Sequence, residues 1–225
     1  MARSALLVLA DGRFPAGGHA HSGGAEAAVK DGRITGGASL EEFCRGRLHT
    51  AGLVGAAFAA AACLGVDVRE LDAGLDARTP SPALRGVARR LGRQLARAGR
   101  ATWPSAELDA LALEFPKGAH QPVVLGLVAR GAGLDAGDAA YCAVYESVSG
   151  PVSATVRLLS LDPFDGTRVL AGLSAEMDLV VDAAVSAARS AVAGEGVEVL
   201  PAVSAPLSEI CAEVHAGWAT RLFAS

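Results

Sequence analysis

The feature that most constrains the fold is an uncharged apolar run at residues 51–66, made mainly of alanine and glycine. Its length of about 16 residues falls short of the roughly 20 that an α-helix needs to cross a bilayer. A helix that is apolar on every side must be surrounded by other elements. We therefore expect a buried helix at the centre of the fold and no membrane span.

The residues before this run predict where the central helix begins. Ser39-Leu-Glu-Glu42 fits the capping-box pattern, so the helix is expected to run from Ser39 to about Leu64. The chain is 51% hydrophobic with few aromatic residues, so its core must consist of alanine, leucine and valine, which suit close helix packing. We predict an all-α, single-domain bundle of roughly seven to ten helices spanning residues 1–225.

A second helix, expected after Pro82, carries a basic stripe. Its apolar face has a helical spacing, with Leu84, Val87, Ala88, Leu91, Leu95 and Ala98. Arginines advance by four along the other side, with two more beside them: Arg85, Arg89, Arg93, Arg97, Arg90 and Arg100. Two interpretations stay open, a solvated helix face or a docking face for an acidic partner.

Three further helices are indicated by their ends or their periodicity. Asp135 and Asp162-Pro163 are typical of helix starts, while Pro151 should kink or break the helix between them because it cannot donate to the Ser147 carbonyl. A last helix is expected from about Leu207 to Phe223, with Ile210, Val214, Trp218 and Leu222 on one face.

Charge and cysteine usage limit the compartment and the partners. The net charge of −4 and pI near 5.7 argue against nucleic-acid or membrane binding. The cysteines form no C-x-x-C pair, so we expect four buried thiols, Cys44, Cys63, Cys142 and Cys211, in a reducing cytoplasm. The apolar run near Met1 is shorter than a signal-peptide core, which agrees with a cytoplasmic location.

The most specialised segment is residues 11–26, which holds two Gly-Gly pairs, Pro15, His19 and His21. It lacks the Lys-Ser or Lys-Thr of a phosphate-binding loop, and no catalytic set accompanies it. The two imidazoles offer a transient metal contact, but no third ligand lies near in sequence, so no stable metal site is expected. Glu26 belongs to the first turn of the helix that follows.

Residues 14–26, Phe-Pro-Ala-Gly-Gly-His-Ala-His-Ser-Gly-Gly-Ala-Glu, resemble the opening signature of the UreF family of urease accessory proteins. The end, Arg-Leu-Phe-Ala-Ser at residues 221–225, resembles that family's closing Arg-Leu-Phe-Arg-Ser, and segments at 89–95, 120–123 and 153–158 fit as well. Departures are Ala25, Ala216, Ala224 and Leu161-Asp-Pro. Ala216 and Ala224 stand where the family has Glu and Arg, which implies weaker charged contacts at the tail and a larger part for Leu222 and Phe223.

The resemblance implies a non-enzymatic, cytoplasmic chaperone that forms a homodimer, binds UreD (also called UreH) and recruits the GTPase UreG to deliver Ni²⁺ to apo-urease. It implies no cofactor of its own, since GTP is bound by UreG and Ni²⁺ passes through the complex. The expected partner-binding parts are the loop 11–26 and the helix and tail 207–225. Their candidate residues are Pro15, Gly17, Gly18, His19, His21, Ser22, Glu26, His215, Arg221, Leu222, Phe223 and Ser225.

Two rival functions remain open from the residues. One is a helical enzyme whose site is the Gly/His loop. The other is a small regulatory helical protein without any connection to nickel.

Overall fold

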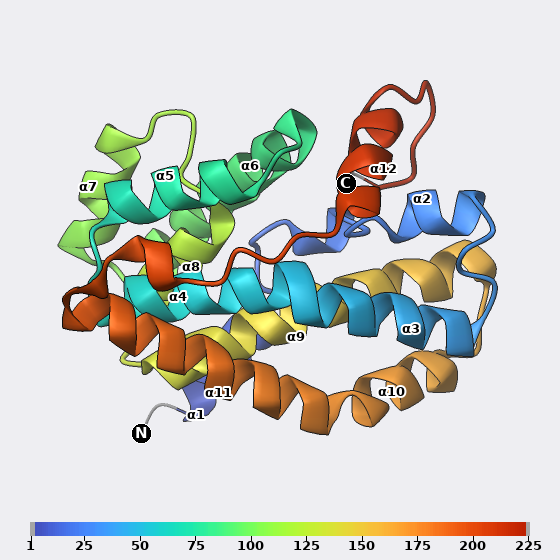
Figure 1. The fold of residues 1–225 in the computed structure, drawn as a ribbon, viewed down its shortest axis with the longest axis horizontal. Helices are drawn as coiled ribbons and strands as arrows, with labels where there is room; N and C mark the ends of the chain where they lie inside the picture. The colour runs from blue at the N-terminus through green and yellow to red at the C-terminus, as the bar shows by residue number, and fades with distance from the viewer. Residues whose placement is uncertain (1–2, 224–225) are drawn as a thin grey trace.

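The computed structural model describes residues 3–223, in which every regular element is helical and no strand occurs (Figure 1). The α-helices are α1 (Arg3–Ala10), α2 (Ala25–Lys30), α3 (Gly37–Arg47), α4 (Leu53–Leu64), α5 (Val68–Arg78), α6 (Pro82–Thr102), α7 (Ala106–Glu114), α8 (Gln121–Gly131), α9 (Ala136–Leu159), α10 (Pro163–Gly172), α11 (Ser174–Ser190) and α12 (Pro206–Ala216). Short 3-10 or π turns are η1 (Gly18–Ala20), η2 (Leu48–Gly52), η3 (Ala191–Glu195) and η4 (Val197–Val199). The all-α prediction is confirmed. The described residues form more α-helices than the roughly seven to ten expected. Helices as short as α2 leave no apolar periodicity in the sequence, so they were not predicted.

The predicted central helix is α4, which packs against α8, α9 and α11. Nine of its twelve residues are buried, most of them alanines. Close approach is possible because the α8 residue facing it is Gly126, where a Cβ would collide with the carbonyl oxygen of Ala59. The segment Gly37–Leu64 is long and apolar enough to cross a membrane, but 61% of its most apolar window is buried inside the fold, as in a core helix.

The start of this helical segment differs from the prediction. The helix α3 begins at Gly37, so Ser39 is its third residue and not its cap. The Ser39 hydroxyl reaches back and accepts hydrogen bonds from the backbone N–H groups of Thr35 (2.9 Å) and Gly36 (3.2 Å). The same side chain therefore satisfies the helix start from inside the first turn. The helix then continues through η2 into α4 and ends at Leu64, as expected.

Pro151 lies inside α9 without ending it. The ring removes the hydrogen bond that the Ser147 carbonyl would receive, as expected. The Nε of Arg47, at the end of α3, donates to that carbonyl at 3.1 Å instead. A side chain from another helix thus replaces the missing backbone donor, and the helix runs on to Leu159. Its start at Asp135 and that of α10 at Asp162 are confirmed, since both side chains accept backbone N–H bonds there.

The C-terminal helix is shorter than predicted. It ends at Ala216 and not near Phe223, and the following residues turn back toward the start of the chain. The expectation of four buried thiols also fails at one position. Cys44, Cys63 and Cys142 are buried, whereas Cys211 on α12 is partly exposed and accepts a bond from Arg33 at 3.1 Å.

Candidate partner-binding site at the joined chain ends

The two end segments singled out in the sequence meet at one carboxylate, Glu26. It lies in the first turn of α2, as expected. One oxygen accepts the backbone N–H of Leu222 at 2.8 Å, and the other lies 2.9 Å from His215 Nε2 and 3.1 Å from the backbone nitrogen of Phe223. We call Glu26, His215, Leu222 and Phe223 the latch, because this set joins the first and last segments of the chain.

The latch is a buried, charge-assisted assembly. The side chain of Glu26 is 10% exposed and that of His215 is 1% exposed. Burial alone would raise the pKa of Glu26, but the hydrogen bonds from Leu222, His215 and Phe223 outweigh it and lower that pKa below its ordinary value. The carboxylate is therefore ionised at neutral pH and holds the tail firmly.

Aromatic contacts cover the latch on two sides. The Trp218 ring lies 4.6 Å from the His215 ring, and the ammonium of Lys30 sits 3.7 Å from the Trp218 centroid. The Phe223 side chain is buried under Arg157, whose guanidinium carbon lies 4.5 Å from its ring. These cation–π contacts stabilise the positions of the Trp218 and Phe223 rings. Of the expected pair, Phe223 thus packs inside the chain and only Leu222 faces outward.

The glycines of the loop have separate roles. Gly17 has φ of 85° and a Cβ there would meet the Gln94 side chain, and Gly23 and Gly24 have φ of 57° and 90°. Only glycine adopts these angles without strain. Gly18 has an ordinary φ and open space around it, so it carries no such requirement. The sequence marks all these glycines alike, and only the backbone angles distinguish them.

The two loop histidines lie in different environments. His19 is exposed, and its carbonyl accepts a bond from Arg157 at 3.1 Å. His21 is half-buried, and its Nδ1 has no partner within the described residues. Burial, with the nearby charges of Arg90 and His19, lowers the pKa of His21 to about 4, so its imidazole is neutral at pH 7. The structure brings neither histidine into a group of three potential metal ligands within residues 3–223.

One described group of potential ligands does converge elsewhere, at Asp72, Asp76 and His120. Its oxygens are already occupied. Arg89 donates to Asp72 at 2.8 Å and to Asp76 at 2.7 Å, while His120 contacts the remaining oxygen of each through its backbone N–H and its Nε2, both at 2.8 Å. The guanidinium fills the place of a cation, so these residues form an ion cluster that ties α5 and α6 to the start of α8. We call these four residues the Arg89 cluster.

The helix α12 is anchored through its acidic side. Glu209 accepts the backbone N–H of Ser81 and Glu213 that of Ala83, each at 2.8 Å, at the start of α6. The hydrogen bond with the Ser81 hydroxyl, then that with the Ala83 N–H, lowers the pKa of Glu213. These anchors were not predicted from the sequence. The only indication in the sequence is that acidic side chains favour the positive N-terminal end of a helix, and here that helix, α6, is distant in the chain.

On the side away from its buried Ala212 and His215, α12 presents an apolar face to solvent. Leu207, Ile210 and Val214 lie at helical spacing and are exposed, and Leu222 of the tail is exposed as well. The remaining predicted residues differ in their exposure. Pro15 and Arg221 are exposed and Ser22 is buried, while Ser225 and the substituted Ala224 lie outside the described residues. We call Leu207, Ile210, Val214 and Leu222 the end face.

Comparison with known proteins agrees with the resemblance of the two end motifs. The family model described as UreF matches residues 34–174. A protein named urease accessory protein UreF from Mycobacterium sp. (strain JLS) is 40% identical over 222 residues, covering 98% of this chain and 97% of its own. Proteins of the same name from Mycolicibacterium vanbaalenii and Mycobacterium marinum are 38% and 40% identical, each with 98% of this chain and 97% of its own covered. The matched segment and the nearly full-length relatives lead to one conclusion: the chain belongs to the UreF family of urease accessory proteins.

Proposed function

We propose that this protein is a non-catalytic scaffold of urease maturation that binds UreD (UreH) through its end face and, with it, recruits the GTPase UreG for nickel delivery to apo-urease. The end face is the observation that carries this proposal. Three exposed apolar side chains on α12, Leu207, Ile210 and Val214, fit the helix-in-groove mode of recognition, in which residues at i, i+3 and i+7 anchor in a partner, and Leu222 of the tail adds a fourth exposed apolar side chain.

The anchoring of α12 supports a binding role. The latch holds the tail and the acidic side chains hold the helix, so the end face is ordered before a partner arrives. Preorganisation reduces the entropy that association must otherwise overcome. The loop 11–26 supplies one half of the latch, which gives its glycines and Glu26 a positioning part in the same surface.

The remaining parts of the proposal follow from membership of the family. We propose that the protein acts in the cytoplasm as a homodimer, has no cofactor of its own, and modulates the GTPase state of UreG. Ni²⁺ is then a cargo of the complex and GTP a ligand of UreG. Any contact of Ni²⁺ with His19 and His21 would be transient, through the neutral imidazole of His21.

Co-purification with tagged UreD and UreG tests the proposal. We expect the double variant Ile210→Asp, Val214→Asp to recover at least about tenfold less of either partner, because two carboxylates would have to be buried in an apolar interface. Urease activation in cells that carry this variant should fall in parallel.

The matched control is Leu113→Asp on α7, a leucine that is 86% exposed and lies outside the end face. It should leave recovery of both partners unchanged, and circular dichroism should show native helix content for all variants. Undiminished co-purification of the double variant would refute the end face as the docking site.

A further inference from the structure

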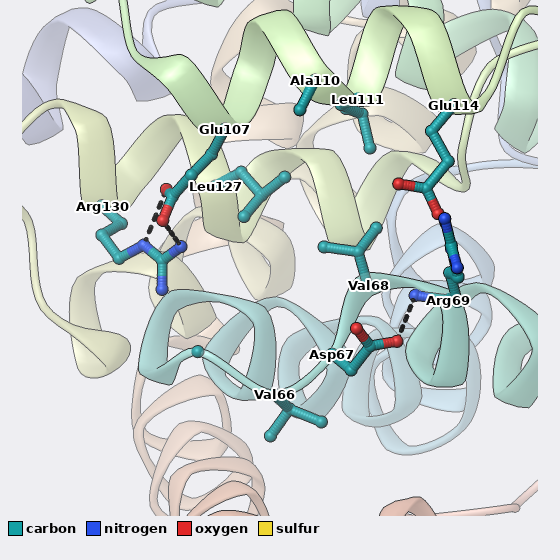
Figure 2. A pocket seen from close by; sticks show the side chains of 11 residues that line it. Val66, Asp67, Val68, Arg69, Glu107, Ala110, Leu111, Glu114, Leu127 and Arg130 are labelled. Atoms are coloured by element: carbon teal, nitrogen blue, oxygen red, sulfur yellow. Dashed lines mark hydrogen bonds and ion pairs between the residues drawn. The ribbon is translucent and has the colours of Figure 1, made fainter.

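Two hollows of similar size lie on either side of α7, and they differ in charge. The first, of about 270 Å³, lies between α7, α8 and the start of α5 (Figure 2). Its two arginines are neutralised within the fold, since Arg130 pairs with Glu107 and Arg69 with Glu114. The dashed lines in Figure 2 show Arg130 and Glu107 directed at one another across its edge. This hollow leaves no unpaired arginine for a ligand.

The second hollow, of about 240 Å³, lies between α6 and the segment 111–119. Its floor is apolar, with Ala96, Leu111 and Phe115, and its rim carries Arg93, Arg97 and Arg100 from the basic stripe of α6. All three arginine side chains are exposed. We call it the arginine-rimmed hollow.

The walls of this hollow are fixed by backbone contacts. A Cβ on Gly92 would collide with the carbonyl oxygen of Ala119, and one on Gly118 with that of Arg89. Two arginines hold the same segment from α6, with Arg89 donating to the Gly118 carbonyl at 2.9 Å and Arg93 to the Lys117 carbonyl at 3.1 Å. The hollow is therefore preformed, which favours binding.

The charges around the hollow are unbalanced. Arg100 pairs with Asp109 at 2.7 Å, but Arg93 and Arg97 form no ion pair among residues 3–223. Lys117 adds a further exposed cation in the facing segment. The other half of the stripe differs, because Arg85 and Arg89 both contact Asp76. The stripe therefore has one half that is paired with carboxylates of α5 and one half whose Arg93 and Arg97 are without ion pairs in the described residues.

We propose that the arginine-rimmed hollow binds an acidic segment of a partner protein, with one large apolar side chain on the floor and flanking carboxylates on Arg93 and Arg97. The hollow is smaller than the roughly 300–1,000 Å³ of small-molecule sites, so it suits a single side chain. Guanidinium groups bind carboxylates in bidentate geometry, which matches the unpaired rim. The net charge of −4 argues against a nucleic acid as occupant.

Fluorescence anisotropy of the full-length protein with a labelled peptide, Gly-Glu-Asp-Leu-Phe-Glu-Asp-Gly, tests this site. Arg97→Glu should weaken binding by about tenfold or more through charge reversal at the rim. Ala112→Trp, which fills the lining without changing charge, should also weaken it. Replacing Leu and Phe of the peptide by Ser should have an effect of similar size.

The matched control is Arg90→Glu, an exposed arginine of the same helix that does not line the hollow. It should change affinity by less than about twofold. Equal losses for Arg90→Glu and Arg97→Glu, no loss for Ala112→Trp, no saturation up to about 1 mM peptide, or full competition by a single-stranded 20-mer DNA would each overturn the proposal. The hollow and the end face share no residues, so the peptide assay tests this site separately from the co-purification of UreD and UreG.

Discussion

The latch and the Arg89 cluster both place a histidine against carboxylates, yet they stabilise different parts of the molecule. In the cluster, a guanidinium bridges two carboxylates, and three helices depend on it. In the latch, one carboxylate accepts two backbone N–H groups from the last residues of the described chain. The difference lies in what each carboxylate holds: packed helices in one case and a short tail in the other.

This contrast teaches that similar side-chain chemistry has unequal consequences. Loss of Arg89 from the cluster leaves a carboxylate buried without its cation, because the Asp72 side chain is only 7% exposed. Loss of the latch frees a segment that few other contacts retain, so the effect should remain local. Loss of the latch should therefore loosen the tail and the loop while the helical core stays folded.

The largest expected effect comes from breaking the cluster with Arg89→Met. The variant leaves two carboxylates without the Arg89 guanidinium, so we expect the free energy of unfolding to fall. The loss should be about 3 kcal/mol, the lower end for a broken buried ion pair, because Arg89 is partly exposed to solvent. Urea denaturation followed by circular dichroism measures it. Arg97→Met, the same change on the same helix without an ion pair in the described residues, should shift stability by less than about 0.5 kcal/mol. Equal shifts for both variants would contradict the assigned role of the cluster.

A smaller effect is expected from Glu26→Gln, which removes the charge of the latch and keeps its shape. Hydrogen bonds to a charged acceptor are stronger than those to a neutral one, so the tail should loosen by about 1–2 kcal/mol. Hydrogen exchange at the amides of Leu222 and Phe223 should accelerate by about tenfold, while amides in α4 stay protected. Glu42→Gln, at an exposed glutamate of α3, is the control. Unchanged exchange at both tail amides would show that Glu26 does not hold the tail.

The smallest effect is a dependence on acid. Folding lowers the pKa of Glu26, so its stabilising contribution is complete above the ordinary value of 4.5 and is lost as pH falls through the lower folded value. The pKa of Asp76 is also lowered from its ordinary value of 3.8, because the contacts with His120 and Arg89 outweigh the burial that alone would raise it. Its stabilising contribution is therefore also lost as the pH falls. The latch should therefore begin to weaken at a higher pH than the cluster.

Trp218 fluorescence in a Trp103→Phe background reports the latch, because Trp218 contacts His215. We expect its change on acidification to precede the loss of helical circular dichroism. In Glu26→Gln the early fluorescence change should disappear. A single transition shared by both signals would mean that the latch and the core lose stability together.

Much of the scaffold was predictable because it depends on local patterns. The apolar run at residues 51–66 indicated a buried helix, and the side chains of Asp135 and Asp162 mark helix starts in the structure as they do in the sequence. The exceptions were decided by distant groups. Arg47 lets α9 continue past Pro151, and the turn after Ala216 replaces the last predicted helical turns.

The candidate site was predictable in its parts but not in its geometry. The resemblance selected Glu26, His215, Leu222 and Phe223 from opposite ends of the chain, yet nothing in the sequence joins them. Gly17 and Gly18 look equivalent in the sequence, and only the positive φ of Gly17 separates them. Trp218, Lys30 and Arg157 were missed as members of the same site because ring contacts leave no local pattern.

The sequence by itself determined the helical class, the central apolar helix and the two end motifs, because periodicity and capping act over a few residues. Tertiary structure alone decided that Glu26 receives the tail, that Arg89 is neutralised while Arg97 is not, and that Phe223 turns inward. These outcomes depend on contacts between groups of different elements, which lie 13 residues apart in the chain for Arg89 and Asp76 and 197 apart for Glu26 and Phe223. Burial, hydrogen bonding and charge pairing then assign each group its state.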